Sequence, residues 1–91
     1  MNRRLKVVIL SHSNIAPRQQ SFWKHFSLYA DTLVISPSKW ANHTVKSNKE
    51  DNYEIYADDV ANAGDMFRFH FSPLAFEKIK KFNPDIIYHQ N

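Results

Sequence analysis

Residues 5–23 read "LKVVILSHSNIAPRQQSFW": an apolar run, a polar loop and then an aromatic segment. The apolar run is typical of a short strand buried on both faces of a parallel sheet, so we expect a strand over residues 5–11. Pro17 suits the first position of a helix, where its missing N–H costs nothing. The apolar residues that follow share one helical face: Phe22, Trp23, Phe26 and Ala30. The stretch therefore predicts a buried strand that leads through a polar loop into a helix.

The next segments repeat this alternation. "TLVIS" (32–36) predicts a second buried strand, and "YEIYA" (53–57) predicts a third. The polar residues 37–52 between them are interpreted as a long connection. The alternating "FRFHF" (67–71) is compatible with either a short strand or an extended loop.

A second helix and a last strand follow. Ser72 and Pro73 are a good N-cap and a good first helical residue. The apolar face of this helix is expected to consist of Leu74, Ile79 and Phe82. Three lysines near its C-terminal end suit the helix dipole: Lys78, Lys80 and Lys81. "PDIIYHQN" supplies the last strand, over residues 85–90.

This order of elements predicts an α/β fold with a mostly parallel, Rossmann-like sheet and two main helices. The usual strand order, 3-2-1-4, would place the strand at 85–90 beside the strand at 5–11. No covering helix follows the last strand, so the sheet is expected to be incomplete. We therefore expect residues 1–91 to form the first part of a longer domain, without an internal boundary.

Composition narrows the classes of function. The chain has 91 residues, of which 43% are hydrophobic, enough for a core, and it carries a net charge of +3. It has no cysteine, which excludes disulfides, thiolate metal sites and a cysteine nucleophile, and fits a reducing compartment. The mild positive charge leaves phosphorylated small molecules, a membrane surface and nucleic acid open as partners. The apolar N-terminal run is too short for a signal peptide, so a cytoplasmic location is expected.

The sequence lacks the residues that several kinds of functional site require. The loop after the first strand contains no glycine, which argues against a dinucleotide site and a P-loop. The five histidines show no metal-type spacing, and nothing resembles the elbow of a serine nucleophile. No metal or cofactor is therefore expected.

Polar residues follow two strands that are expected to be neighbours. Ligands of open α/β sheets bind beyond the carboxyl ends of such strands. The candidates for substrate binding at these two ends are His12, Ser13, Asn14, Tyr88, Gln90 and Asn91. If the strands are neighbours, the two groups face each other across a crevice; the alternative is that they are ordinary loop residues.

Arg18 is the remaining candidate. A cation in the first turn of a helix opposes the helix dipole, and its presence makes sense if an anion binds there too. The alternative is that Arg18 reaches an acidic side chain or solvent.

Several motifs together resemble a known enzyme family. "LKVVILSHSNIAPRQQSFWKHFS", "DTLVISPSKW" and "FNPDIIYHQN" follow one another in the order seen at the start of GT-B glycosyltransferases of the large retaining family four. The resemblance covers residues 1–91, which would be the first half of the N-terminal Rossmann-like domain. In that family the strand that matches "PDIIYHQN" ends in two histidines, which correspond to Tyr88 and Gln90.

The resemblance implies transfer of a sugar from a nucleotide-sugar donor to a sugar or glycolipid acceptor, without a metal. This part of the enzyme would mainly hold the acceptor, at the cytoplasmic face of the membrane, and nucleic acid is not expected as a partner. Most donor-binding residues would lie in the remainder of the chain, so the 91 residues alone are expected to be inactive, and their catalytic residues are unknown. The alternative is a small non-catalytic α/β module that binds an anionic ligand or nucleic acid.

Overall fold

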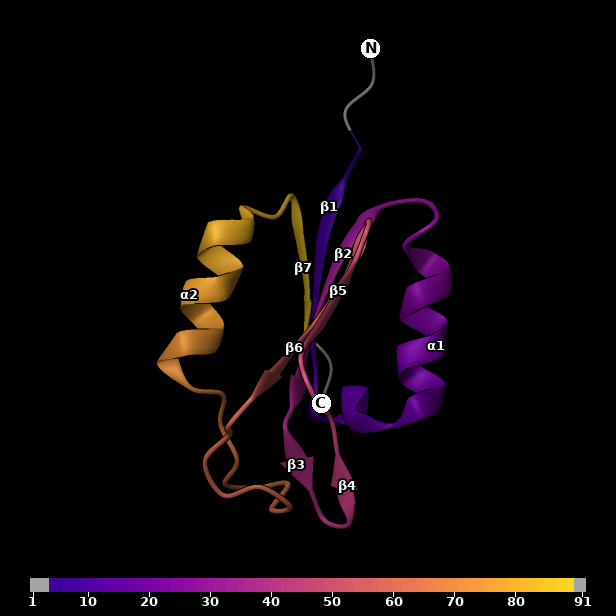
Figure 1. The fold of residues 1–91 in the computed structure, drawn as a ribbon. Helices are drawn as coiled ribbons and strands as arrows, with labels where there is room; N and C mark the ends of the chain where they lie inside the picture. Colours follow the sequence, from indigo (N-terminus) through magenta and orange to yellow (C-terminus); the bar gives the residue numbers. More distant parts are fainter. Residues whose placement is uncertain (1–3, 90–91) are drawn as a thin grey trace.

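The computed structural model describes residues 4–89 as an α/β fold with a mixed five-stranded sheet and a small separate hairpin (Figure 1). The elements, in chain order, are β1 (Lys6–Leu10), the 3₁₀ helix η1 (His12–Ile15), α1 (Pro17–Phe26), β2 (Asp31–Pro37), β3 (Lys39–Trp40), β4 (His43–Thr44), β5 (Asn48–Glu50), β6 (Tyr53–Asp58), α2 (Pro73–Phe82) and β7 (Ile86–His89). The α/β class expected from the sequence is confirmed, and β1, β2, β6 and β7 lie where the sequence predicted strands.

The five strands lie in the order β5-β6-β2-β1-β7. β1 pairs in parallel with β2 on one side and with β7 on the other, so the predicted contact between the first and last strands is confirmed. β6 is parallel to β2, whereas β5 is antiparallel to β6 and forms one edge. β1 is therefore an interior strand, and the loop that follows it leaves the middle of the sheet.

The two α-helices lie on opposite faces of the sheet (Figure 1). Alternate residues of β1 serve the two faces, because successive strand side chains point in opposite directions. Val8 and Leu10 belong to the core cluster that includes α2 residues, whereas Val7 and Ile9 belong to the cluster on which α1 packs. The prediction that this strand is buried on both faces is confirmed.

Each helix presents a narrower apolar face than the sequence suggested. On α1, Trp23 and Phe26 pack against the core, but Phe22 is 61% exposed, contrary to expectation. On α2, Ala75 and Ile79 are buried, whereas Leu74 is 66% exposed, also contrary to expectation. On α2 the reason is geometric, because Ala75 and Ile79 are four residues apart and share a helix face, whereas Leu74 is adjacent to Ala75.

The segment 37–52 is not the plain connection that its polarity suggested. It holds the antiparallel hairpin of β3 and β4 and the edge strand β5. Short strands rich in polar residues at a sheet edge lack the hydrophobic alternation by which strands are recognised. The segment 67–71, by contrast, is not a regular strand: its first two residues belong to a turn, and it makes a single bridge between His70 and Ala61.

Candidate functional site

The carboxyl ends of β1 and β7 lie at one edge of the sheet, because Leu10 and His89 are neighbours in the parallel register. The loop after β1 therefore leaves the sheet beside the end of β7, as the predicted site requires. Gln90 and Asn91 lie outside the described residues.

The loop after β1 contains no glycine, and its turn is stabilised by side-chain hydrogen bonds. Ser11 caps η1: its Oγ accepts the Ser13 N–H at 3.2 Å and lies 2.8 Å from the Ser13 Oγ. A serine hydroxyl is a good partner for the free N–H groups at a helix start. Ser13 is half-buried, and its hydroxyl is engaged in a hydrogen bond with the Ser11 hydroxyl.

Asn14 ties the first two strands together. Its side chain is fully buried, and its Nδ2 donates hydrogen bonds to the backbone oxygens of Ile9, at 3.2 Å, and Ile35, at 3.0 Å. These two oxygens lie near the carboxyl ends of β1 and β2. Asn14 therefore acts in the architecture of the edge, and its nitrogen is not available to a ligand.

His12 lies in an aromatic cluster. Its ring centroid is 5.0 Å from that of Trp40 on β3 and 5.5 Å from that of Phe69 in the loop before α2. Phe69 in turn contacts Phe71, which belongs to the core on the α2 side. The Nδ1 atom of His12 is buried and has no hydrogen-bond partner within residues 4–89.

Tyr88 makes its ring contact elsewhere. Its ring centroid lies 6.1 Å from that of Trp23, which packs on the α1 side of the sheet. The ring contacts thus place Tyr88 on the α1 face of the sheet and His12 on the α2 face. The expected arrangement, in which these two side chains face each other across one crevice, is not what the described contacts show.

Arg18 is the second residue of α1 and is exposed. Ala16, the N-cap, provides no side-chain hydrogen bond, so the first turn of the helix keeps free N–H groups. Arg18 forms no hydrogen bond or ion pair in the part of the chain that the structure describes. The alternative in which Arg18 pairs with an acidic side chain is therefore not seen.

A hollow of about 310 Å³ adjoins the start of α1. It is lined in part by Pro17 and Gln20 of α1, by His43 of β4 and by Lys46 in the segment that follows β4. Arg18 is not among the residues that line it. Lys46 brings one positive charge to this helix start, which suits an anion.

Asp58 is a residue of this edge that the sequence analysis missed. It is the last residue of β6 and is 1% exposed. Its carboxylate accepts hydrogen bonds from the Ser72 N–H, at 2.7 Å, and from the Ser72 hydroxyl. Burial, followed by the charges of Asp58 and Asp59, raises the pKa of the nearby Tyr56 hydroxyl. An acidic residue directly after an apolar strand was the available signal.

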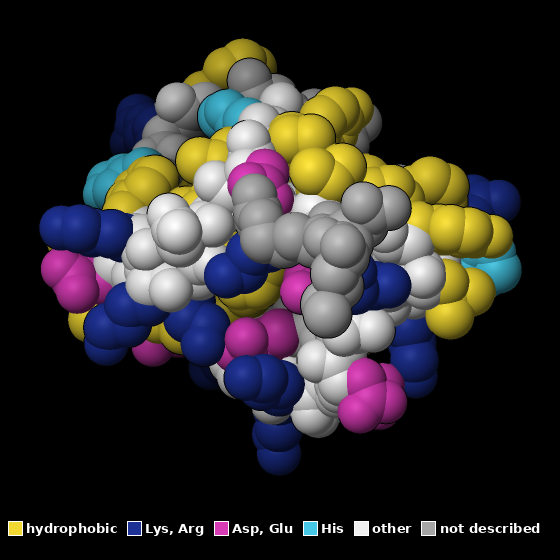
Figure 2. Space-filling view, turned by 90° about the horizontal axis from the view of Figure 1, so that it is seen from above, with side chains coloured by type: hydrophobic (Ala, Val, Ile, Leu, Met, Phe, Trp, Pro, Cys, Tyr) yellow, Lys and Arg dark blue, Asp and Glu magenta, His cyan; other side chains and the backbone are white. Residues whose placement is uncertain are grey.

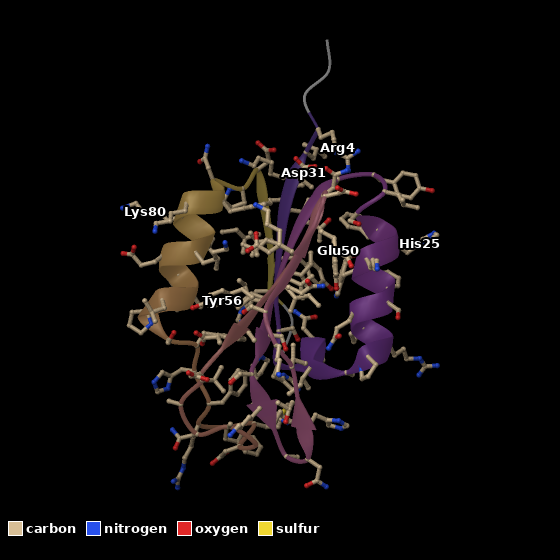
Figure 3. All side chains as sticks on the ribbon, viewed as in Figure 1. Arg4, His25, Asp31, Glu50, Tyr56 and Lys80 are labelled. Atoms are coloured by element: carbon tan, nitrogen blue, oxygen red, sulfur yellow. The ribbon has the colours of Figure 1, made fainter. Side chains whose placement is uncertain are left out.

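The opposite edge, where the strands begin, carries a different hollow. It measures about 350 Å³ and is lined mainly by charged residues, among them Lys49, Asp51 and Lys81. Figure 2 looks onto this edge and shows lysine or arginine and acidic side chains intermingled there. Two ion pairs lie at this edge: Arg4 with Asp31 at 2.8 Å, seen together in Figure 3, and Lys78 with Glu54 at 2.6 Å.

Comparisons with protein families, with curated proteins and with solved structures find no match for this chain. Within residues 4–89, no cluster of three histidine, aspartate or glutamate side chains is placed to hold a metal ion. In the same range, no helix has the length and apolarity needed to cross a membrane.

Proposed function

We propose that the chain is the acceptor-side, N-terminal part of a GT-B glycosyltransferase. In this proposal residues 1–91 form the first half of a Rossmann-like domain. The parent enzyme moves a sugar from a nucleotide-sugar donor to a sugar or glycolipid acceptor at the cytoplasmic face of the membrane. No metal or other cofactor takes part.

The observation that carries the proposal is the pairing of β1 between β2 and β7. It brings the loop 11–16 and the end of the "PDIIYH" strand to one edge of a parallel array. This is the edge where ligands of open α/β sheets bind. The parallel strands β6, β2, β1 and β7 follow one another as a Rossmann-like half-domain would require. The order of the sequence motifs supplies the remaining support.

The proposed roles differ between the candidate residues. Tyr88 is half-exposed and can contact an acceptor, as can Gln90 and Asn91 beyond it, whose amides hydrogen-bond sugar hydroxyls. In this proposal a phosphate is bound by Arg18 and by the N–H groups of the first turn of α1, where the N-cap makes no side-chain hydrogen bond. His12 and Asn14 have a structural role at this edge, because His12 packs against Trp40 and Asn14 donates a hydrogen bond to the backbone oxygen of Ile35.

The parent gene provides the sharpest experiment. We expect its reading frame to continue past Asn91 for some hundreds of residues and to encode a second α/β domain. The purified parent should transfer sugar from one member of a panel of nucleotide sugars, whereas the 91-residue chain should not, because a GT-B site forms between two domains. Turnover by the 91-residue chain would contradict this architecture.

A second candidate function is a non-catalytic module that binds an anionic ligand. Arg18 favours it, because its side chain has no partner among residues 4–89 and it lies at a helix start without a side-chain cap. A natural stop codon directly after Asn91, together with binding of a nucleotide or inorganic phosphate to the isolated chain in a calorimetric titration, would support the module over the enzyme.

A further inference from the structure

The hollow at the edge where the strands begin, which we call the strand-start hollow, lies between the sheet and the C-terminal half of α2. Its volume of about 350 Å³ falls in the lower part of the range found for small-molecule pockets. Its lining within residues 4–89 comes from β1, β2, β5, β6, α2 and the turn between β5 and β6. β7 contributes none of these residues, so the outer edge of the sheet is not part of the hollow.

Four lysines converge on the strand-start hollow from three elements. Lys6 shares a face of β1 with the residues that pack against α2, because alternate strand residues point the same way. Lys49 of β5 lies directly opposite Glu54 of β6, so their side chains share a face. That face is also the α2 face, because Glu54 pairs with Lys78 of α2. Lys81 follows Lys78 by three residues and therefore lies on the same side of the helix.

The acidic residues of the hollow neutralise only part of this positive charge. Glu54 pairs with Lys78 at 2.6 Å, and Asp31 pairs with Arg4 at 2.8 Å. Asp51, in the turn between β5 and β6, is the remaining acidic residue of the lining and is exposed. Three lysines are thus left against one carboxylate, which gives the hollow a net charge of about +2.

The three remaining lysines keep their full charge. Lys6 lies over the ring of Phe82, with its Nζ 5.0 Å from the ring centroid. The face of an aromatic ring attracts a cation without neutralising it. Lys49 and Lys81 form no ion pair within residues 4–89. A concave surface with an excess of one charge concentrates small ions of the opposite charge.

The dipole of α2 explains only part of this arrangement. Cations in the last turn of a helix suit its negative end, which accounts for Lys80 and Lys81. Lys6 and Lys49 lie on strands, where the net backbone dipole is small. Their convergence with Lys81 brings like charges together, and an anion in the hollow would offset this repulsion.

We propose that the strand-start hollow binds the phosphate group of a phosphorylated small molecule, held by Lys6, Lys49 and Lys81. A phosphate monoester carries about −1.5 to −2 charges at pH 7, which matches the charge of the hollow. Each lysine ammonium can donate charge-assisted hydrogen bonds to its oxygens. The site lies at the opposite edge of the sheet from Arg18, and it does not rest on the glycosyltransferase assignment.

NMR titration of the 91-residue chain with inorganic phosphate, at pH 7 and low ionic strength, tests this site. We expect saturable shifts of the backbone amide signals of Lys6, Lys49 and Lys81. Arg18→Ala should leave these shifts unchanged, because Arg18 lies at the other edge. Shifts that do not saturate, or saturable shifts confined to the start of α1, would overturn the proposal.

Three matched variants test the ligands. Lys49→Gln and Lys81→Gln should each weaken phosphate binding about tenfold, the effect of one lost hydrogen bond to a charged group. Lys80→Gln is the control: it removes the same charge from the same helix turn, but Lys80 lies on the outer side of α2 (Figure 3) and does not line the hollow. Its effect should stay within about twofold, because solvent and salt screen exposed charges.

Equal weakening by Lys80→Gln and Lys81→Gln would show a general attraction to basic surface and would contradict a built site. The amide spectra recorded for the titrations also verify that each variant is folded.

Discussion

The buried carboxylate of Asp58 accepts hydrogen bonds from both the backbone N–H and the hydroxyl of Ser72. Ser72 is the N-cap of α2, yet its own side chain makes no capping bond within the helix. The carboxyl end of β6 and the start of α2 are thus joined through one side chain, across the loop 59–71. This link adds to the packing of Ala75 and Ile79 in holding α2 on the sheet.

Loss of the Asp58 carboxylate should therefore destabilise the fold. We expect Asp58→Ala to lower the free energy of unfolding by about 2–3 kcal/mol, because a buried acceptor is removed and the half-buried donors of Ser72 lose their partner. The control is Asp59→Ala, next in sequence but exposed, which removes only an exposed hydrogen bond from the Ser38 hydroxyl at 2.7 Å, so the expected loss is at most about 1 kcal/mol. Urea denaturation at pH 7 measures both, and equal losses in the two variants would count against the link.

Asn14 provides a second structural test at the same edge. Its two donated hydrogen bonds serve the backbone oxygens of Ile9 and Ile35. Asn14→Asp keeps the shape but replaces the donor with an acceptor, so we expect it to cost at least as much stability as Asn14→Ala, about 1–3 kcal/mol. Asn42→Ala, at an exposed position, is the control. An Asn14→Asp variant as stable as the wild type would mean that these two hydrogen bonds do not stabilise the fold.

Tyr53 should make the protein sensitive to alkali. Burial, together with the nearby charge of Glu50, raises the pKa of the Tyr53 hydroxyl to about 12 in the folded state, from 10.0. Between these values the unfolded chain releases the proton and the folded chain keeps it. Stability contributed by the neutral hydroxyl is therefore fully present below pH 10 and is lost as the pH rises towards 12.

Tyr53→Phe isolates this effect. The variant loses the hydrogen bond that the hydroxyl donates to the backbone oxygen of Gln20 at 3.0 Å, so we expect it to be less stable at pH 7 by about 1 kcal/mol. Its further loss of stability between pH 10 and pH 12 should be smaller than that of the wild type. Urea melts over this range measure the slope, and parallel slopes for the two proteins would refute the assignment.

The sequence predicted the strongly patterned elements well, for identifiable reasons. The run of residues 7–10 can only be stable where both faces are covered, and Pro17 and Pro73 mark the two helix starts. The short polar strands β3, β4 and β5 were missed because they are held by backbone pairing and carry no hydrophobic period.

The candidate site was predicted less completely. A strand order brings backbone ends together, and it does not determine the face on which each side chain lies. His12 packs against Trp40 because a hairpin absent from the prediction provides that ring. Asn14 is buried because η1 turns it back towards the strand ends, and sequence periodicity contains no signal for such a turn.

Arg18 decides whether the polar loop serves a ligand. It is exposed in the first turn of α1 and has no partner among the described residues. Arg18→Ala should leave stability unchanged or raise it by roughly 0.3 kcal/mol, since a cation leaves the positive end of the helix. In the parent enzyme proposed above, the same change should weaken binding of a phosphorylated ligand by about 1–3 kcal/mol, the scale of a lost charge-assisted hydrogen bond.

Lys24→Ala, in the last turn of the same helix, is the matched control for Arg18→Ala. Lys24 favours the negative end of the dipole and pairs with Glu50 at 2.9 Å, so its loss should lower stability by about 0.5–1 kcal/mol without affecting the ligand. Thermal melts measure the first quantity and calorimetric titration measures the second. If Arg18→Ala instead lowers stability and leaves affinity unchanged, Arg18 has a structural role, and the loop between β1 and α1 is a connection rather than a binding site.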